Sequence, residues 1–144
     1  MAFAAPALQP EHGYVILVVV LVAAVHVWAG MRVFAARRLY GIAYPQMYAE
    51  TKHEHFLAFN CVQRAHQNVV ENLPVFLSLL FASSVYRPLA AAIAGLIRVL
   101  GFVAYVHFYS SGDPAKRQYG SFGNIGMLIL LGLTFEAAYR LISA

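Results

Sequence analysis

The feature that most constrains the fold of this chain is the lack of charge in its first long apolar run. No Asp, Glu, Lys or Arg occurs between Glu11 and Arg32. A helix of about 20 apolar residues spans the hydrocarbon core of a bilayer, and a helix pairs its own backbone N–H and C=O groups there. Three more apolar runs follow. The sequence therefore predicts an all-α integral membrane protein, with one domain over residues 1–144.

The apolar runs predict a bundle of four transmembrane helices. We expect the helices at about residues 13–36, 56–85, 88–109 and 121–142. The composition agrees, because 61% of the residues are hydrophobic and only 11% are charged, against about 25% charged in a soluble domain. The start of the chain lacks a basic segment before its apolar run, so we expect the first helix to be retained rather than cleaved as a signal peptide.

The net charge of +4 comes from basic residues that cluster at the ends of the apolar runs. Half of the ten Lys and Arg residues lie in the first loop, about residues 37–55, and in the third, residues 110–120, where Gly112-Asp113-Pro114 predicts a turn. This distribution indicates membrane anchoring rather than nucleic-acid binding, and it places both loops in the cytoplasm. We expect the protein to lie in the endoplasmic reticulum membrane if it is eukaryotic and in the inner membrane if it is bacterial.

The second apolar run is interrupted by an unusual density of polar residues. Arg64, Asn68 and Glu71 are spaced i, i+4 and i+7, which places them on one face of a helix. Seven residues correspond to about 10 Å along the axis, so we expect no direct ion pair between Arg64 and Glu71. Each then needs a partner on another helix, another subunit or a ligand.

Two other helices carry similar polar lines. Arg98, Tyr105 and Tyr109 share a face of the third helix, and His26 and Arg37 fall on one line of the first. A charge at the bilayer centre costs at least about 2.5–3.5 kcal/mol and should face protein or a water-filled cavity. Polar networks can simply hold helices together. A facing set of Arg, Asn and Glu instead favours a ligand with separated positive and negative ends, since Arg grips a carboxylate.

The six histidines offer weaker alternatives. His53 and His55 flank Glu54 too closely for a di-iron site, and we interpret them as solvated. His26, His66 and His107 fall on three helices, so a haem-binding or purely structural bundle is a second hypothesis. That hypothesis leaves the Arg/Asn/Glu stripe unexplained, and we expect no metal.

The single cysteine and two of the glycines indicate packing between helices. Cys61 is the single cysteine, which excludes an intramolecular disulfide, and packing is favoured over a nucleophilic role. Gly120 and Gly123 indicate close packing between helices.

At the polar stretch the chain resembles the family of membrane-associated proteins in eicosanoid and glutathione metabolism (MAPEG). The block "RAHQNVVE", residues 64–71, carries the family's Arg-Ala-x-x-Asn-x-x-Glu pattern. The first loop, "ARRLYGIAYPQMY", and the segment "YVHFYSSGDPAKRQYGSFG" are similar to the branch of type 3 microsomal glutathione S-transferases. The similarity spans about residues 30–135, with three motifs in the correct order.

The resemblance implies a homotrimer of four-helix protomers, with glutathione between neighbouring protomers near the cytoplasmic surface. It also implies the residues that form the site. The glutathione-binding set is Arg37, Arg64, His66, Asn68, Glu71, Asn72, Tyr105 and Tyr109. Arg117 matches the arginine that stabilises the thiolate, and Arg38 is the second catalytic candidate. Asn72 replaces a Tyr of the family's leukotriene-forming synthase, and the third loop is one residue longer, so Lys116 is an alternative to Arg117.

The resemblance further implies a detoxifying transferase. The enzyme would activate glutathione as its co-substrate and conjugate it to lipophilic electrophiles, or reduce lipid hydroperoxides as a peroxidase. The alternative within the same fold is a protein that binds and presents lipid without catalysis. The expected partners are glutathione, a lipophilic electrophile or lipid hydroperoxide, membrane lipid and two further copies of the chain.

Overall fold

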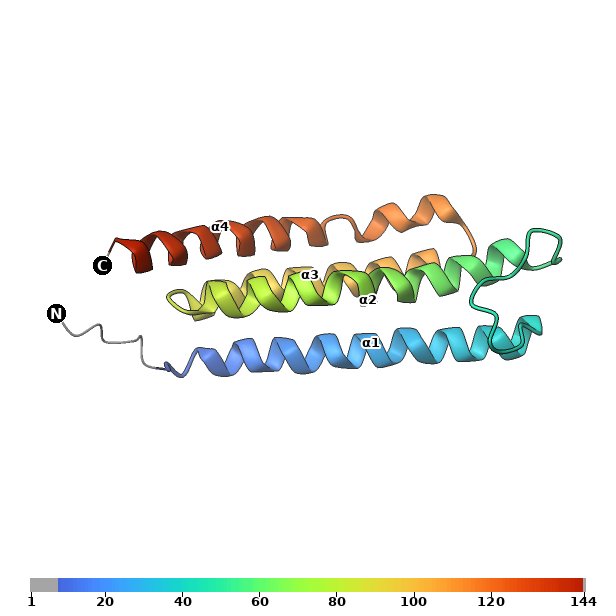
Figure 1. Ribbon diagram of the computed structural model, residues 1–144, viewed down its shortest axis with the longest axis horizontal. Coiled ribbons are helices and arrows are strands. Elements are labelled where there is room, and N and C mark those ends of the chain that lie inside the picture. Colours follow the sequence, from blue (N-terminus) through green and yellow to red (C-terminus); the bar gives the residue numbers. More distant parts are fainter. Residues whose placement is uncertain (1–7, 144) are drawn as a thin grey trace.

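The computed structural model describes residues 8–143 and is entirely helical (Figure 1). It contains four α-helices and one short 3-10 helix, η1. Their bounds are α1 His12–Tyr40, α2 Phe56–Ser84, α3 Pro88–Tyr109, η1 Pro114–Gly120 and α4 Gly123–Ile142. Three of these helices, α1, α3 and α4, are each long and apolar enough to cross a membrane. The prediction of an all-α membrane protein is thus supported by three candidate spans, and α2 is as long as α1 but more polar.

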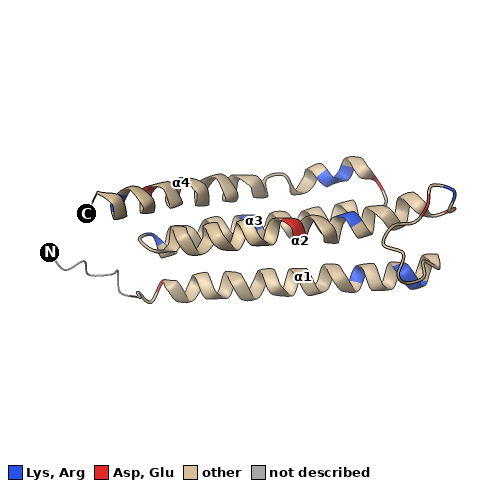
Figure 2. Ribbon diagram, viewed as in Figure 1, with Lys and Arg blue, Asp and Glu red and all other residues tan. Residues whose placement is uncertain are grey.

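The helices lie side by side, with α2 and α3 in the middle. Both α1 and α4 pack on this central pair, from opposite sides (Figure 1). The α1–α2 connection and the segment around η1 lie at one end of the molecule, and the short α2–α3 connection lies at the other (Figure 1). Most Lys and Arg residues gather in the half that carries η1 (Figure 2). The two basic loops therefore share one end.

Two segments differ from the sequence prediction, one at the end of α1 and one in the third loop. The first helix continues to Tyr40, because no residue breaks it before Gly41, which adopts the left-handed backbone conformation with φ 69°. Residues 114–120 form η1, where an open loop is expected from the sequence. The side chain of Asp113 starts this turn by accepting a hydrogen bond from the backbone N–H of Ala115 at 3.0 Å. The Gly112 turn precedes it, with φ 87°.

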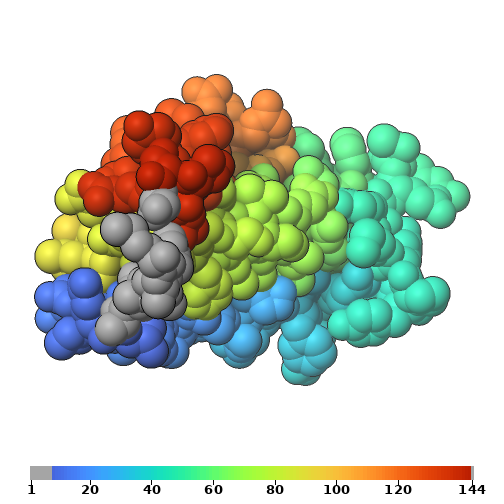
Figure 3. Space-filling view, turned by 60° about the vertical axis from the view of Figure 1, so that its left-hand side comes forward, coloured from blue at the N-terminus to red at the C-terminus, as the bar shows by residue number. Residues whose placement is uncertain are grey.

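The core lies along the axis between the helices. Phe76 of α2 and Phe102 of α3 meet edge to face, with ring centroids 6.1 Å apart, and both are fully buried. The outer faces carry large exposed apolar side chains such as Ile16 and Leu128. An apolar exterior of this extent suits a lipid environment. The space-filling view shows α1 to α4 as contiguous bands from blue to red (Figure 3).

Glycines bring α3, η1 and α4 into contact, as the sequence predicts for Gly120 and Gly123. A Cβ atom on Gly123 would lie 2.8 Å from the Cα of Gly101, and one on Gly120 would lie 2.5 Å from the Cβ of Tyr105. No side chain fits at either position. The close approach places the start of α4 directly over the polar half of α3.

Candidate functional site

A polar pocket of about 330 Å³ opens where α2, α3, η1 and the start of α4 meet. It is within the size range of small-molecule sites. Its lining residues are Asn68, Asn72, Arg98, Gly101, Phe102, Tyr105, Arg117, Gln118, Gly120, Ser121 and Asn124. Most of these side chains are polar, although the surrounding helices are apolar. A pocket of this kind suits a small polar ligand held within a membrane protein.

The inner end of the pocket is formed by Arg98. Its Nη1 donates to Oδ1 of Asn124 at 2.7 Å, and its Nη2 donates to Oδ1 of Asn72 at 2.8 Å. Asn72 in turn donates from Nδ2 to the backbone carbonyl of Asn68 at 2.8 Å, which turns its oxygen toward the guanidinium. The ring of Phe102 lies 4.3 Å from the Arg98 Cζ. One buried cation thus ties α2, α3 and α4 together.

The outer part of the pocket contains Arg117, which η1 carries. The neighbouring Lys116 lines no part of this pocket, and its Nζ lies 4.0 Å from a carboxylate oxygen of Asp113. Of the two residues that the sequence leaves as alternatives, Arg117 is therefore the one at the pocket. The 3-10 turn separates them, because consecutive residues of a helical turn point in different directions.

Tyr105 lines the pocket together with Arg117, and it lies about one helical turn before Tyr109, the last residue of α3. Its ring meets that of Tyr109 edge to face, with centroids 5.4 Å apart. Tyr109 itself is buried and does not line the pocket. The two tyrosines predicted to share a face do contact each other, but only Tyr105 is presented to a ligand within this protomer.

Arg64 and Glu71 form a direct ion pair, with Nη1 and Oε1 3.3 Å apart. The expectation that seven residues are too many for such a pair is wrong. Both side chains lie on the same face of α2, and the long Arg side chain spans the two turns. Both are about half exposed, so this pair lies on an outer surface of the protomer.

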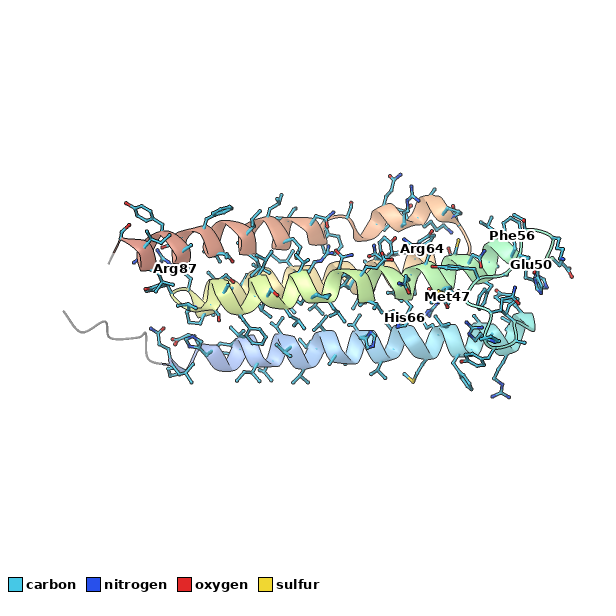
Figure 4. The ribbon with its side chains drawn as sticks, in the orientation of Figure 1. Met47, Glu50, Phe56, Arg64, His66 and Arg87 are labelled. Atoms are coloured by element: carbon cyan, nitrogen blue, oxygen red, sulfur yellow. The ribbon has the colours of Figure 1, made fainter. Side chains whose placement is uncertain are left out.

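His66 points to the other side of α2 from Arg64, toward α1 (Figure 4). Its ring stacks at a tilt on His26 of α1, with centroids 5.2 Å apart. Gly30 lies beside this contact, where a Cβ would stand at an ordinary van der Waals distance of 3.7 Å from the His66 Nε2. His66 thus packs between α1 and α2 and is separate from the pocket.

The two arginines that end α1 have different surroundings. Arg37 is buried, donates from Nη1 to the backbone carbonyl of Gln46 at 2.6 Å, and lies 4.5 Å from the ring of Tyr44. It fixes the first loop against α1. Arg38 is exposed, and its guanidinium carbon lies 6.0 Å from the ring centroid of Phe34. Neither lines the pocket of this protomer.

Comparison with known proteins settles the family. The model of the MAPEG family matches residues 15–139, which is most of the chain. The chain belongs to the MAPEG family. A function related to glutathione or eicosanoid metabolism follows from this membership. The family includes glutathione transferases as well as members that are not catalytic.

In this MAPEG protein, three of the residues named by the resemblance on α2 and α3 meet at one pocket with Arg117. They are Asn68, Asn72 and Tyr105. The Arg64–Glu71 pair lies on the same helix but on an exposed face, and the remaining predicted residues lie elsewhere.

Sequence reasoning missed the contribution of η1 and α4 to the pocket. Gln118, Ser121 and Asn124 line it, and Asn124 binds Arg98. A signal was present, because Asn124 is an isolated amide at the start of an apolar run. Arg98 was assigned to a polar stripe but not to the site, and its position shows that it belongs to the pocket.

No group of three or more His, Cys, Asp or Glu side chains in residues 8–143 is arranged to hold a metal ion. Cys61 is buried in the core between helices, in line with a packing role. His107 lies on an exposed part of α3, away from the pair formed by His26 and His66.

Proposed function

We propose that this MAPEG protein is a membrane-bound glutathione transferase that also reduces lipid hydroperoxides. The observation that carries the proposal is the polar pocket, which holds Asn68, Tyr105 and Arg117 together in an otherwise apolar protein. Glutathione is a zwitterionic tripeptide with two carboxylates and one amine. An intramembrane site for it has to supply cations, hydrogen-bond donors and an anion, and the pocket and the nearby Arg64–Glu71 pair supply these groups.

In the proposed complex, Glu71 accepts the ammonium of glutathione and Arg64 binds a carboxylate. The ion pair between them opens when the zwitterion inserts, so each charge exchanges one partner for another. Asn68 and Tyr105 donate hydrogen bonds from the pocket wall. Asn72 contributes from the wall of the same pocket. Arg37, His66 and Tyr109 remain proposed contributors through the homotrimer, in which a neighbouring protomer brings its own residues to the ligand.

Arg117 is proposed to hold the sulfur of glutathione as a thiolate. The thiolate is the nucleophile, whereas a free thiol has a pKa of about 8.5 and is mostly protonated at pH 7. A fixed cation nearby favours the charged form, and arginine keeps its charge at any working pH. Arg38 is the second catalytic candidate. It lies on the exposed end of α1 and would act across the interface between protomers.

The electrophile is proposed to enter from the bilayer. In a transfer reaction, the thiolate forms a carbon–sulfur bond and the leaving group departs with the electron pair of the broken bond. In the peroxidase reaction, the thiolate attacks the terminal peroxide oxygen, the O–O bond breaks, and the alkoxide takes up a proton and leaves as an alcohol. The sulfenic acid formed on the first glutathione then reacts with the thiol of a second glutathione to give the disulfide and water. We also propose that α2 spans the membrane as the fourth helix, and that the basic loops face the cytoplasm.

The test is to incubate the detergent-solubilised protein with glutathione and 1-chloro-2,4-dinitrobenzene, and separately with a lipid hydroperoxide. Conjugate formation above the uncatalysed rate is the expected result. A protein that binds glutathione or lipid but turns over neither electrophile would be a lipid-presenting member of the family instead. A protein that binds neither would contradict the proposal.

A further inference from the structure

Arg98 is a buried cation with no carboxylate within 4.0 Å among residues 8–143. Its side chain is 6% exposed, and its hydrogen-bond partners are the neutral amide oxygens of Asn72 and Asn124. No Asp or Glu lines the pocket that it closes. Arg64, Arg87 and Arg140 each lie within 4.0 Å of a carboxylate, and Arg37, the other buried arginine of the described chain, donates to a backbone carbonyl near the end of α1.

The position of Arg98 in α3 makes the burial of its charge unfavourable in free energy. It is the eleventh residue of a 22-residue helix, so it lies near the middle of the membrane-spanning segment. A charge at that depth is costly even on the mildest insertion scale. Two amide oxygens satisfy hydrogen bonds but provide no opposite charge. A buried cation is tolerated best when an anion completes its surroundings.

The guanidinium also has hydrogen-bonding capacity left over. Arginine carries five N–H donors, and two of them are used by Asn72 and Asn124. The Nε atom is buried and has no partner among the described residues. Phe102 covers one face of the group, and the polar pocket lies beside it. A ligand in the pocket therefore reaches a cation that is fixed in place and incompletely paired.

We propose that the inner end of this pocket is a carboxylate-binding subsite, with Arg98 as the group that holds the carboxylate. The polar walls and the second cation, Arg117, at the outer end suit an anionic ligand. Two sources present the same chemistry. One is a carboxylate of glutathione, in which case the inference rests on the proposed function, and the other is a lipophilic carboxylic acid from the bilayer.

The sharpest variant supplies the missing anion from within the protein. Asn124→Asp has nearly the same shape as the native residue and places a carboxylate about 2.7 Å from the Arg98 Nη1. It should raise the melting temperature and lower the affinity for a ligand carboxylate by about tenfold or more, because charged hydrogen bonds are the strong ones. Asn124→Leu is the matched control, since it removes the same amide but adds no charge.

Binding is measured on the full chain in detergent, with probes that differ by one charge. The first set is glutathione, its monoethyl ester at the glycine carboxylate, and the analogue whose γ-glutamyl residue is replaced by 4-aminobutyrate. The second set is cis-parinaric acid and its methyl ester, followed by fluorescence. Each set identifies one source, because only the probe that carries the bound carboxylate loses affinity in Asn124→Asp relative to Asn124→Leu.

The outcomes separate this inference from the proposed function. Glutathione that weakens about tenfold, while one of its carboxylate-deficient analogues does not, assigns the subsite to that carboxylate. Parinaric acid that weakens while its ester does not assigns it to a lipophilic acid, whether or not glutathione binds. If every probe binds Asn124→Asp and Asn124→Leu equally, the subsite is disproved even when the protein is an active transferase.

A second variant tests the same subsite from another helix, so that the test remains possible if Asn124→Asp misfolds. Asn72→Asp places the new carboxylate on α2, next to the Arg98 Nη2, where the present separation is 2.8 Å. It should reproduce the pattern of Asn124→Asp. A purely structural role of Arg98 predicts the opposite result for binding, namely higher thermal stability in both Asp variants with unchanged affinity for all five probes.

Discussion

The guanidinium of Arg64 reaches the carboxylate of Glu71 along the surface of α2, with 3.3 Å between Nη1 and Oε1. The two side chains are 44% and 48% exposed. In contact with water, a pair of this kind contributes at most about 1 kcal/mol to stability. The pair therefore adds little to the stability of the fold. It is well suited to a zwitterionic ligand, because the ammonium and the carboxylate of the ligand can replace the two partners at once.

Replacement of Glu71 tests this exchange. Glu71→Gln keeps the shape but removes the negative charge, so glutathione loses the partner of its ammonium. We expect the affinity for glutathione to fall by about 1–3 kcal/mol, the scale of a charged hydrogen bond. Calorimetry on the assembled protein measures it. Glu136→Gln is the control, because Glu136 pairs with Arg87 and Arg140 at the opposite end of the molecule, and unchanged binding in both variants would place the amine elsewhere.

Arg117 is expected to govern the ionisation of bound glutathione. Lowering the thiol pKa by about two units corresponds to roughly 2.7 kcal/mol and makes thiolate the main form at pH 7. Arg117→Ala should remove most of the thiolate ultraviolet absorbance near neutral pH. Turnover should fall by about one to two orders of magnitude on the same scale, while glutathione binding weakens much less.

The pH dependence gives the same prediction a second readout. A cation lowers the thiol pKa, so the absorbance of the unmodified complex should reach half its maximum below about pH 8.5 and move upward in Arg117→Ala. Lys116→Ala is the matched control, since Lys116 faces Asp113 instead of the pocket. Full thiolate signal in Arg117→Ala, together with its loss in Lys116→Ala or Arg38→Ala, would show that another cation has this role.

The exposed Arg64–Glu71 face leads to a prediction about assembly. With α2 in the membrane as proposed, its half-exposed ion pair is better placed against another protomer than against lipid. We expect a homotrimer in mild detergent, measured by native mass spectrometry. An active preparation that contains only monomer would contradict this prediction.

The close contact of α3 and α4 should tolerate no added methyl group. A Cβ on Gly126 would lie 2.3 Å from the carbonyl oxygen of Ala94, whereas one on Gly132 meets nothing within 4 Å. We expect Gly126→Ala to destabilise the protein by about 1–3 kcal/mol, the usual effect of overpacking. Gly132→Ala, on the same helix, should be neutral or slightly stabilising. Equal melting temperatures for the two variants would show that α4 shifts freely on α3.

Several properties of the protein follow from local sequence patterns. Uncharged runs such as the one between Glu11 and Arg32 specify membrane helices, because the bilayer leaves the backbone few alternatives. The spacing of Arg64 and Glu71 correctly placed them on one face of a helix, and Gly120 and Gly123 correctly indicated close packing. The family was also accessible, since the "RAHQNVVE" block carries a recognisable pattern and the family model matches residues 15–139.

The remaining properties depend on contacts between distant segments and on side-chain reach. Helical spacing gives the distance between two backbone positions, but it did not reveal that the long Arg64 side chain closes the gap to Glu71. Spacing also could not bring Asn124 to Arg98, because 26 residues and a turn separate them. The sequence by itself determined the membrane class, the helices and the polar faces. Only the tertiary structure decided which polar groups meet, since a pocket is formed by the packing of helices and not by any one of them.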